Sequence, residues 1–226
     1  MKNFYQKNIP KEIRISLLVS FILILFRIIL SDSIDFAYLI WNIFLALIPF
    51  IISSVFLVFK DKIKDTRYLF LFILGSIIWL IFFPNTFYLV TDLIHLGEGG
   101  FVPIWYDGLM LLSIAWLGII LGFYSLFQIE ELFLNKFNTI ISRITTTCLI
   151  FLTSFGVYLG RFIRLNSWDL FLESKESLDN IWNIFKNKNN LKEAFIFTFI
   201  FFIFFTTTFF FWKYINKSKI RKSVLN

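Results

Sequence analysis

Asp92 and His95 are the residues of this chain whose types and spacing most directly suit chemistry. Three residues apart, they can share a helical face, which suits an acid–base pair or two metal ligands. His95 is the one histidine, so a three-histidine metal site is excluded. A metal would need Asp92, His95 and Asp107, with Asp169 as a further oxygen ligand, and such a set favours magnesium or manganese. Pairing of these groups with one another is the simpler interpretation, and we assign no metal ligand.

A polar stripe follows Pro84 at the end of an apolar stretch. Asn85, Tyr88, Asp92 and His95 recur at spacings of three and four residues, which places them on one side of a helix. Ionisable side chains near membrane depth are costly, so they are candidate functional groups. Proline disfavours helical backbone in the residue before it, so we expect a break there and a new helix to about His95. Asn85 can then satisfy backbone groups that the break frees.

Arg161 and Arg164 are the second feature suited to chemistry. Three residues apart on a helix, two guanidinium groups can hold a phosphate or a carboxylate. Pairing of either arginine with Asp92 or Asp107 is the alternative, because charges within a membrane usually pair with one another. Arg27, near the end of an apolar run, is expected to reach toward the outer membrane surface.

The chain around these residues is strongly apolar. Hydrophobic residues make up 58% of the 226, and the mean hydropathy is +0.77. Several apolar runs approach the roughly 20 residues that cross a bilayer; they lie at 15–30, 36–59, 68–83, 108–127, 140–159 and 194–212. We therefore predict an all-α polytopic membrane protein with six transmembrane helices, forming a single transmembrane domain over residues 1–226.

The distribution of positive charge predicts the orientation. Most of the 22 Lys and Arg residues lie at the two ends of the chain, between spans two and three, or between spans four and five. The loops after spans one and three contain neither residue, so both termini are predicted to be cytoplasmic. The net charge of +7 therefore follows topology and does not indicate nucleic-acid binding. The loop after span five departs from the rule, since it carries Arg161, Arg164, Lys175, Lys186, Lys188 and Lys192.

Two patterns predict how helices pack. Small-residue pairs, which let helices approach closely, are expected to join spans four and five; they are Gly118 with Gly122 and Gly156 with Gly160. This packing would bring Asp107 near Arg161. Apolar residues then recur at helical spacing at Leu178, Ile181, Trp182 and Phe185, which predicts an amphipathic segment at about 174–190. It is expected on the outer membrane surface, with a lid over the bundle as the alternative.

Three segments carry a family resemblance: FFPNTFYLVTDLIHL, WYDGLMLLSIAWLGIILGFYSL and GVYLGRFIRLNSWDL. They resemble the uncharacterised bacterial integral membrane family named domain of unknown function 1361. The matching positions are Pro84, Asn85, Tyr88, Thr91, Asp92, His95, Trp105, Asp107, Arg161, Arg164, Asn166, Trp168 and Asp169. The resemblance implies a multi-pass protein of the bacterial plasma membrane, and it carries no established activity.

Three classes of function fit these patterns. The first is binding or transport of an anionic solute or lipid head group at a polar cluster on the outer face. Asp92, His95 and Asp107 are then the candidate catalytic or proton-relaying groups, and the candidate substrate-binding residues are Asn85, Tyr88, Arg161, Arg164, Asn166, Trp168 and Asp169. The second is a membrane enzyme acting on a lipid or lipid-linked phosphate, with Asp92 and His95 as acid–base groups. The third is a structural accessory subunit. The expected partners are membrane lipids and an anionic small molecule, and the sequence names no cofactor.

Overall fold

The computed structural model describes residues 9–31, 33–62, 65–98, 102–134 and 139–224, and the regular structure in these ranges is entirely helical. Helices long and apolar enough to cross a membrane occupy the ranges Lys11–Ser31, Tyr38–Lys62, Thr66–His95, Ile104–Leu132, Ile140–Ile163 and Lys188–Ile215. The predicted all-α, six-helix polytopic fold is therefore confirmed, and the protein is a multi-pass membrane protein.

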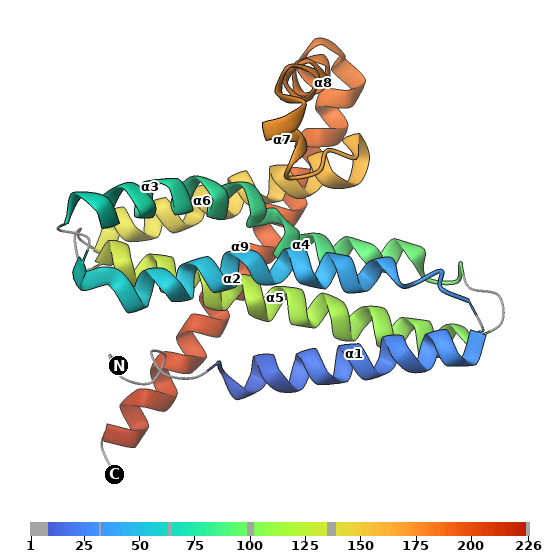
Figure 1. The fold of residues 1–226 in the computed structure, drawn as a ribbon, viewed down its shortest axis with the longest axis horizontal. Helices are drawn as coiled ribbons and strands as arrows, with labels where there is room; N and C mark the ends of the chain where they lie inside the picture. Colours follow the sequence, from blue (N-terminus) through green and yellow to red (C-terminus); the bar gives the residue numbers. More distant parts are fainter. Residues whose placement is uncertain (1–8, 32, 63–64, 99–101, 135–138, 225–226) are drawn as a thin grey trace. The chain divides into compact units, whose positions relative to one another are not determined.

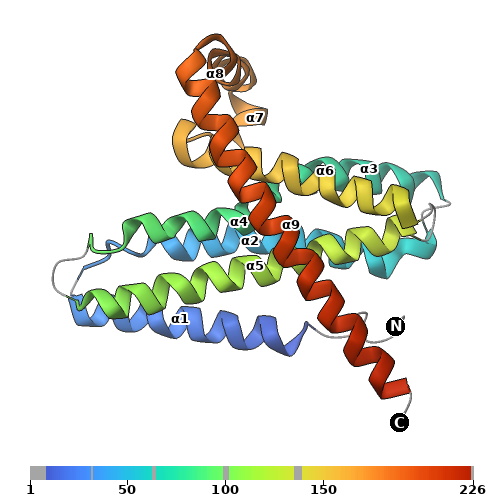
Figure 2. The same cartoon turned by 180° about the vertical axis from the view of Figure 1, so that it is seen from behind.

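The helices fall into two compact units, Met1–Thr139 and Ile140–Asn226, and each is described by itself. Unit 1 is built, in chain order, from α1 (Lys11–Ser31), α2 (Tyr38–Phe59), η1 (Lys60–Lys62), α3 (Thr66–Phe82), α4 (Pro84–Thr91), η2 (Asp92–His95) and α5 (Ile104–Leu134). Figures 1 and 2 show α1, α2 and α4 lying along α5, which is the central and most buried helix of this unit. The prediction of a single domain over residues 1–226 stays a prediction.

The chain breaks at Pro84 as its sequence predicts. Helix α3 ends at Phe82, and α4 begins at Pro84, which occupies its first turn. The amide of Thr86 donates to the carbonyl of Phe83, while the side chain of Asn85 donates to the carbonyl of Phe82 at 2.9 Å. Asn85 thus satisfies a carbonyl near the break, as expected. Phe83 itself keeps right-handed helical backbone (φ −58°, ψ −35°), so the break is a tight kink without an extended residue.

The glycine face of α5 packs against α4. A Cβ atom added to Gly118 would lie 2.2 Å from the carbonyl oxygen of Thr86, and one added to Gly122 would lie 2.8 Å from the ring of Phe87. The neighbour of this face within unit 1 is therefore α4, and the expected packing of spans four and five on each other stays a prediction. A stripe of small residues allows close approach by any neighbouring helix and does not specify which one.

Unit 2 contains α6 (Thr139–Tyr158), a π-helical turn η3 (Leu159–Ile163), α7 (Asp169–Leu172), α8 (Ser174–Lys186) and α9 (Lys188–Val224). A buried cluster of Tyr158, Ile184 and Ala194 joins the end of α6 to α8 and to the first turns of α9. Figure 2 shows α7 and α8 beside the beginning of α9. The predicted amphipathic segment at 174–190 is α8, and α9 begins earlier than the predicted span, at Lys188.

Candidate functional site

Asp107 forms a buried ion pair with Arg27. The Nε of Arg27 donates to Oδ1 of Asp107 at 2.5 Å, and an Nη donates to Oδ2 at 3.4 Å. The two side chains are only 2% and 1% exposed. The guanidinium carbon also lies 4.9 Å from the centre of the Phe36 ring. Arg27 was expected to reach toward the membrane surface, but burial next to a carboxylate and an aromatic ring holds it inside the unit.

Asp92 is also buried, with 1% of its surface exposed. The side-chain amide of Asn42, on α2, donates to Oδ2 of Asp92 at 3.1 Å. A buried carboxylate requires such donors, because burial otherwise penalises its charged form. Asn42 was not among the residues singled out from the sequence, although an amide near the end of an apolar span is a recognisable sign of helix-to-helix bonding.

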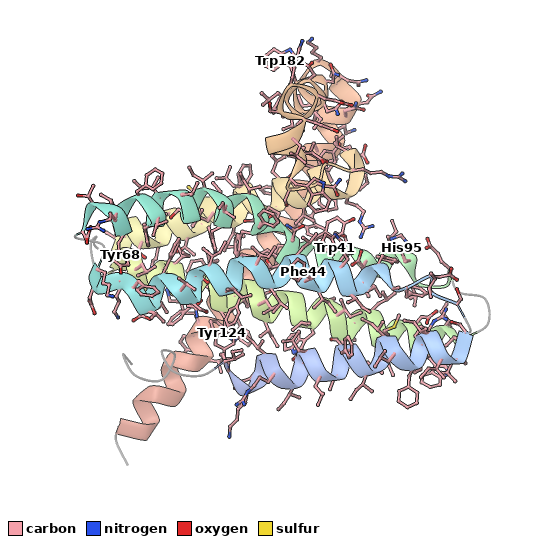
Figure 3. The ribbon with its side chains drawn as sticks, in the orientation of Figure 1. Trp41, Phe44, Tyr68, His95, Tyr124 and Trp182 are labelled. Carbon is pink, nitrogen blue, oxygen red and sulfur yellow. The ribbon has the colours of Figure 1, made fainter. Side chains whose placement is uncertain are left out.

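His95 lies at the end of η2 and faces α2 (Figure 3). Its ring meets the ring of Tyr38 edge to face, with 5.6 Å between centroids, and its Nδ1 lies 2.7 Å from Oε2 of Glu98. Asp92 and His95 therefore both contact α2, but through different partners. In the described ranges, no three His, Cys, Asp or Glu side chains are grouped to hold a metal ion.

These contacts bring Arg27, Asp92, His95 and Asp107 to the same end of unit 1. The rings of Phe36 and Tyr38, 6.2 Å apart, connect the neighbourhood of Arg27 to that of His95. We call this the unit 1 cluster and define it by its five members, Arg27, Asn42, Asp92, His95 and Asp107. Asn85 and Tyr88, the other members of the predicted stripe, are half-buried on α4.

Unit 2 places its candidate residues in a short irregular segment after α6. Arg161 lies in the π-helical turn and is half-buried. Arg164 ends that turn in the left-handed conformation (φ 58°, ψ 31°) and is exposed. The backbone amides of Arg164 and Leu165 both donate to the carbonyl of Leu159. The expected α-helical pair of arginines is thus replaced by a wider turn with a left-handed end.

The residues after Arg164 close this segment. The backbone amide and the side-chain amide of Asn166 donate to Oδ2 of Asp169, at 2.7 and 3.0 Å. Trp168 is half-buried and precedes α7. Asp169 therefore fixes the shape of the turn through Asn166. We call residues 159–169 the arginine turn.

Comparison with known proteins gives a family. A family model described as a protein of unknown function (DUF1361) matches residues 41–208, which is more than half of the chain. The chain belongs to this family. No curated protein matches the chain, and no solved structure matches it. The DUF1361 match includes the arginine turn and every member of the unit 1 cluster except Arg27.

The residues of the predicted site belong to both units of the chain. Asp92, His95 and Asp107 lie at one end of unit 1, and Arg161, Arg164, Asn166 and Asp169 lie in one segment of unit 2. The convergence of all these residues on a single site stays a prediction. Their assignment as catalytic or substrate-binding groups stays a prediction as well.

A buried hydrogen-bond network in unit 1 was not singled out from the sequence. The hydroxyl groups of Ser53 and Ser125 lie 2.9 Å apart, and Ser53 donates to Gln128 at 2.6 Å. The indole of Trp79 donates to Ser125 at 2.8 Å, which ties α3 to α5. The amide of Gln128 donates to Ser54 on α2. The network satisfies its own polar groups, as helix-packing contacts in membranes do, and we assign it a structural role.

Proposed function

We propose that this protein binds a phosphoryl group, carried by a lipid head group or by a soluble phosphate ester, at the arginine turn. Arg161 and Arg164 provide the positive charge and the hydrogen-bond donors. Guanidinium groups present a planar set of N–H donors that matches phosphate oxygens. The observation that carries this proposal is the left-handed backbone of Arg164.

A residue with a Cβ atom pays a steric cost of about 1–2 kcal/mol in the left-handed conformation. Helices that end this way usually have glycine or asparagine at that position. Arg164 is the one described residue other than glycine with a positive φ. Strained backbone of this kind is concentrated at binding sites, where a particular side chain is needed. The presence of arginine, in place of glycine or asparagine, at this strained position supports a role for its guanidinium group.

The surroundings of Arg164 agree with an open anion site. No carboxylate of the described residues forms an ion pair with Arg164, and its side chain is exposed. The nearest acidic residue in the turn, Asp169, accepts two hydrogen bonds from Asn166. An incoming phosphoryl group therefore meets Arg164 without first displacing a local carboxylate.

The position of the turn along the chain supports a site at the level of the lipid head groups. Residues Ile140–Ile163 form one of the membrane-spanning helices, so Arg164 follows the last residue of a span. That is the level of the lipid head groups. We further propose that the membrane is the bacterial plasma membrane, that both termini are cytoplasmic, and that the arginine turn faces outward.

Replacement of Arg164 by asparagine is expected to abolish most of the rise in unfolding temperature that phosphoryl ligands produce, without unfolding the protein. Asparagine tolerates the left-handed conformation, so the turn keeps its backbone while the charge is lost. The measurement is the thermal unfolding midpoint of the full chain in neutral detergent, with added glycerol phosphate or with phosphatidylglycerol in mixed micelles. A ligand at 100 times its Kd stabilises the wild-type protein by about 2.7 kcal/mol. Arg161→Gln should weaken the response in the same direction.

The control is Lys175→Asn, which removes one exposed positive charge from α8 of the same unit. Its unfolding temperature should rise with either ligand as much as that of the wild-type protein. A response to both ligands assigns the phosphoryl group itself as the ligand, and a response to phosphatidylglycerol alone assigns the lipid head group. A wild-type protein that responds to neither ligand contradicts the proposal, as does an Arg164→Asn variant that responds like Lys175→Asn.

The orientation is tested separately. In a Cys148→Ser background, cysteines introduced at Glu98 and Lys186 should react with a membrane-impermeant maleimide in intact cells, and a cysteine at Lys62 should not. Glu98, Lys186 and Lys62 are all exposed, so the difference reports the side of the membrane. Reaction at Lys62 without reaction at the other two positions would place the arginine turn in the cytoplasm.

A further inference from the structure

Helix α8 has a wider apolar face than its own unit covers. Ile184 is 1% exposed and packs with Tyr158 and Ala194. Leu178, Trp182 and Phe185 remain 62%, 60% and 52% exposed. At the helical turn of about 100° per residue, these three lie within about 60° of one another, and Ile184 lies about 100° to one side of Phe185. The helix therefore uses one edge for packing and leaves a second apolar face open.

Contiguous exposed apolar side chains on a helix indicate a surface that is covered by another phase or molecule. The polar side of the helix carries Asp179, Asn183 and Glu176, which lie about 60–120° beyond Trp182 at the same turn per residue. A helix with a strongly apolar side, a strongly polar side and low overall hydrophobicity is typical of helices that lie in the membrane interface. Figure 3 shows Trp182 on α8, at the part of unit 2 that also contains α7.

The attachment of α8 fixes its height relative to the two spans of its own unit. Ile184 packs against Tyr158, in the last turns of the α6 span, and against Ala194, in the first turns of the α9 span. Asn187 alone separates α8 from α9. The helix is therefore held at the end of unit 2 where the α6 span ends and the α9 span begins.

The residue types on the open face fit the boundary between head groups and acyl chains. Trp182 has an apolar ring and one polar N–H group, a combination enriched at membrane interfaces. The ammonium group of Lys186 lies 6.0 Å from the centre of the Trp182 ring, so the charge stands at the edge of the apolar face. Long basic side chains at such an edge reach the head groups while their stems cover apolar surface.

We propose that α8 lies in the interface of the membrane that α6 and α9 span, with Leu178, Trp182 and Phe185 inserted among the acyl chains. The occupant of the open face is thus lipid. A second copy of the chain is the alternative occupant, and the experiment separates the two. This inference does not depend on anion binding by the arginine turn, since it concerns different residues and a different chemistry.

The test uses nitroxide labels on cysteines placed at Leu178, Phe185 or Asp179 of the full chain, in a Cys148→Ser background, reconstituted into phosphatidylcholine vesicles. Leu178 and Phe185 belong to the open face, and Asp179 is a matched control on the polar side of the same helix. Oxygen concentrates in the acyl region and a soluble nickel chelate remains in water. The ratio of oxygen to nickel collision rates should be severalfold higher at Leu178 and Phe185 than at Asp179.

Two outcomes would overturn the proposal. Equal ratios at all three positions would mean that the open face contacts water. Low collision rates with both reagents at Leu178 and Phe185 would mean that protein covers the face, as in an association of two copies. Because all three positions are exposed, their substitution leaves the packing of Ile184 intact, and unfolding at the wild-type temperature confirms that each labelled chain is folded.

Discussion

Replacement of Arg27 by alanine should destabilise unit 1 by about 3–5 kcal/mol, because the carboxylate of Asp107 would then be buried without its counter-charge. Asp107 is 1% exposed and receives two hydrogen bonds from Arg27, so water cannot replace the lost donors without opening α1 from α5. Asp107→Ala should have a similar effect, since it strands the guanidinium group. The measurement is the free energy of unfolding in detergent micelles titrated with a denaturing detergent.

The matched control is Arg14→Ala, which removes an exposed arginine from the same helix and should change stability little. Replacing Arg27 and Asp107 together by leucine should cost much less than the two single changes added together, because no charge remains buried. If the double replacement costs the full sum, the two residues do not act as a pair. If Arg27→Ala and Asp107→Ala lower the free energy of unfolding as little as Arg14→Ala does, the pair is not buried in solution.

The sequence predicted that buried charges would pair, but not which partner each would find. Asp107 was expected to meet Arg161 or Arg164, on the assumption that glycine faces bring spans four and five together. In the structure its partner is Arg27, on the first helix, because α1 packs along α5. Both residues lie at span ends that the charge pattern assigns to one membrane face. The positive-inside rule predicts on which side of the membrane a charged residue lies. Only tertiary packing determines which residue on that side becomes its partner.

Local features were more predictable than contacts between helices. Apolar length alone indicates the six spans, and the preference of proline for the start of a helix indicates the restart at Pro84. The amphipathic period predicts α8, yet it does not reveal that Ile184 is the residue that anchors it. The left-handed backbone of Arg164 was not predictable, because arginine rarely adopts it and no glycine marks the position. Local propensity determines the elements, and packing determines which of their faces meet.

Replacement of Gly118 by alanine should separate α4 from α5 and destabilise the protein by about 3 kcal/mol, at the upper end of the usual cost of overpacking. The added Cβ would lie 2.2 Å from the carbonyl oxygen of Thr86 and 2.9 Å from the Cβ of Leu89. The first of these atoms belongs to the backbone and the second is fixed to it, so no side-chain rotation relieves the clash. Since α4 leads directly into Asp92, the movement should also weaken the contact between Asp92 and Asn42.

Two other glycines of α5 provide a graded control for this result. A Cβ at Gly122 meets the ring of Phe87 and the hydroxyl oxygen of Thr86, both at 2.8 Å, and these side-chain atoms can shift further than backbone, so Gly122→Ala should cost less. A Cβ at Gly108 meets only a methyl carbon of Leu96, at 3.6 Å, which is ordinary contact. Gly108→Ala should therefore be neutral, or stabilising by up to about 1 kcal/mol through better helix propensity. Equal effects at Gly118 and Gly108 would contradict the close approach of α4 to α5, because the same Gly-to-Ala change is made in one helix and only Gly118 has the close contacts with Thr86 and Leu89.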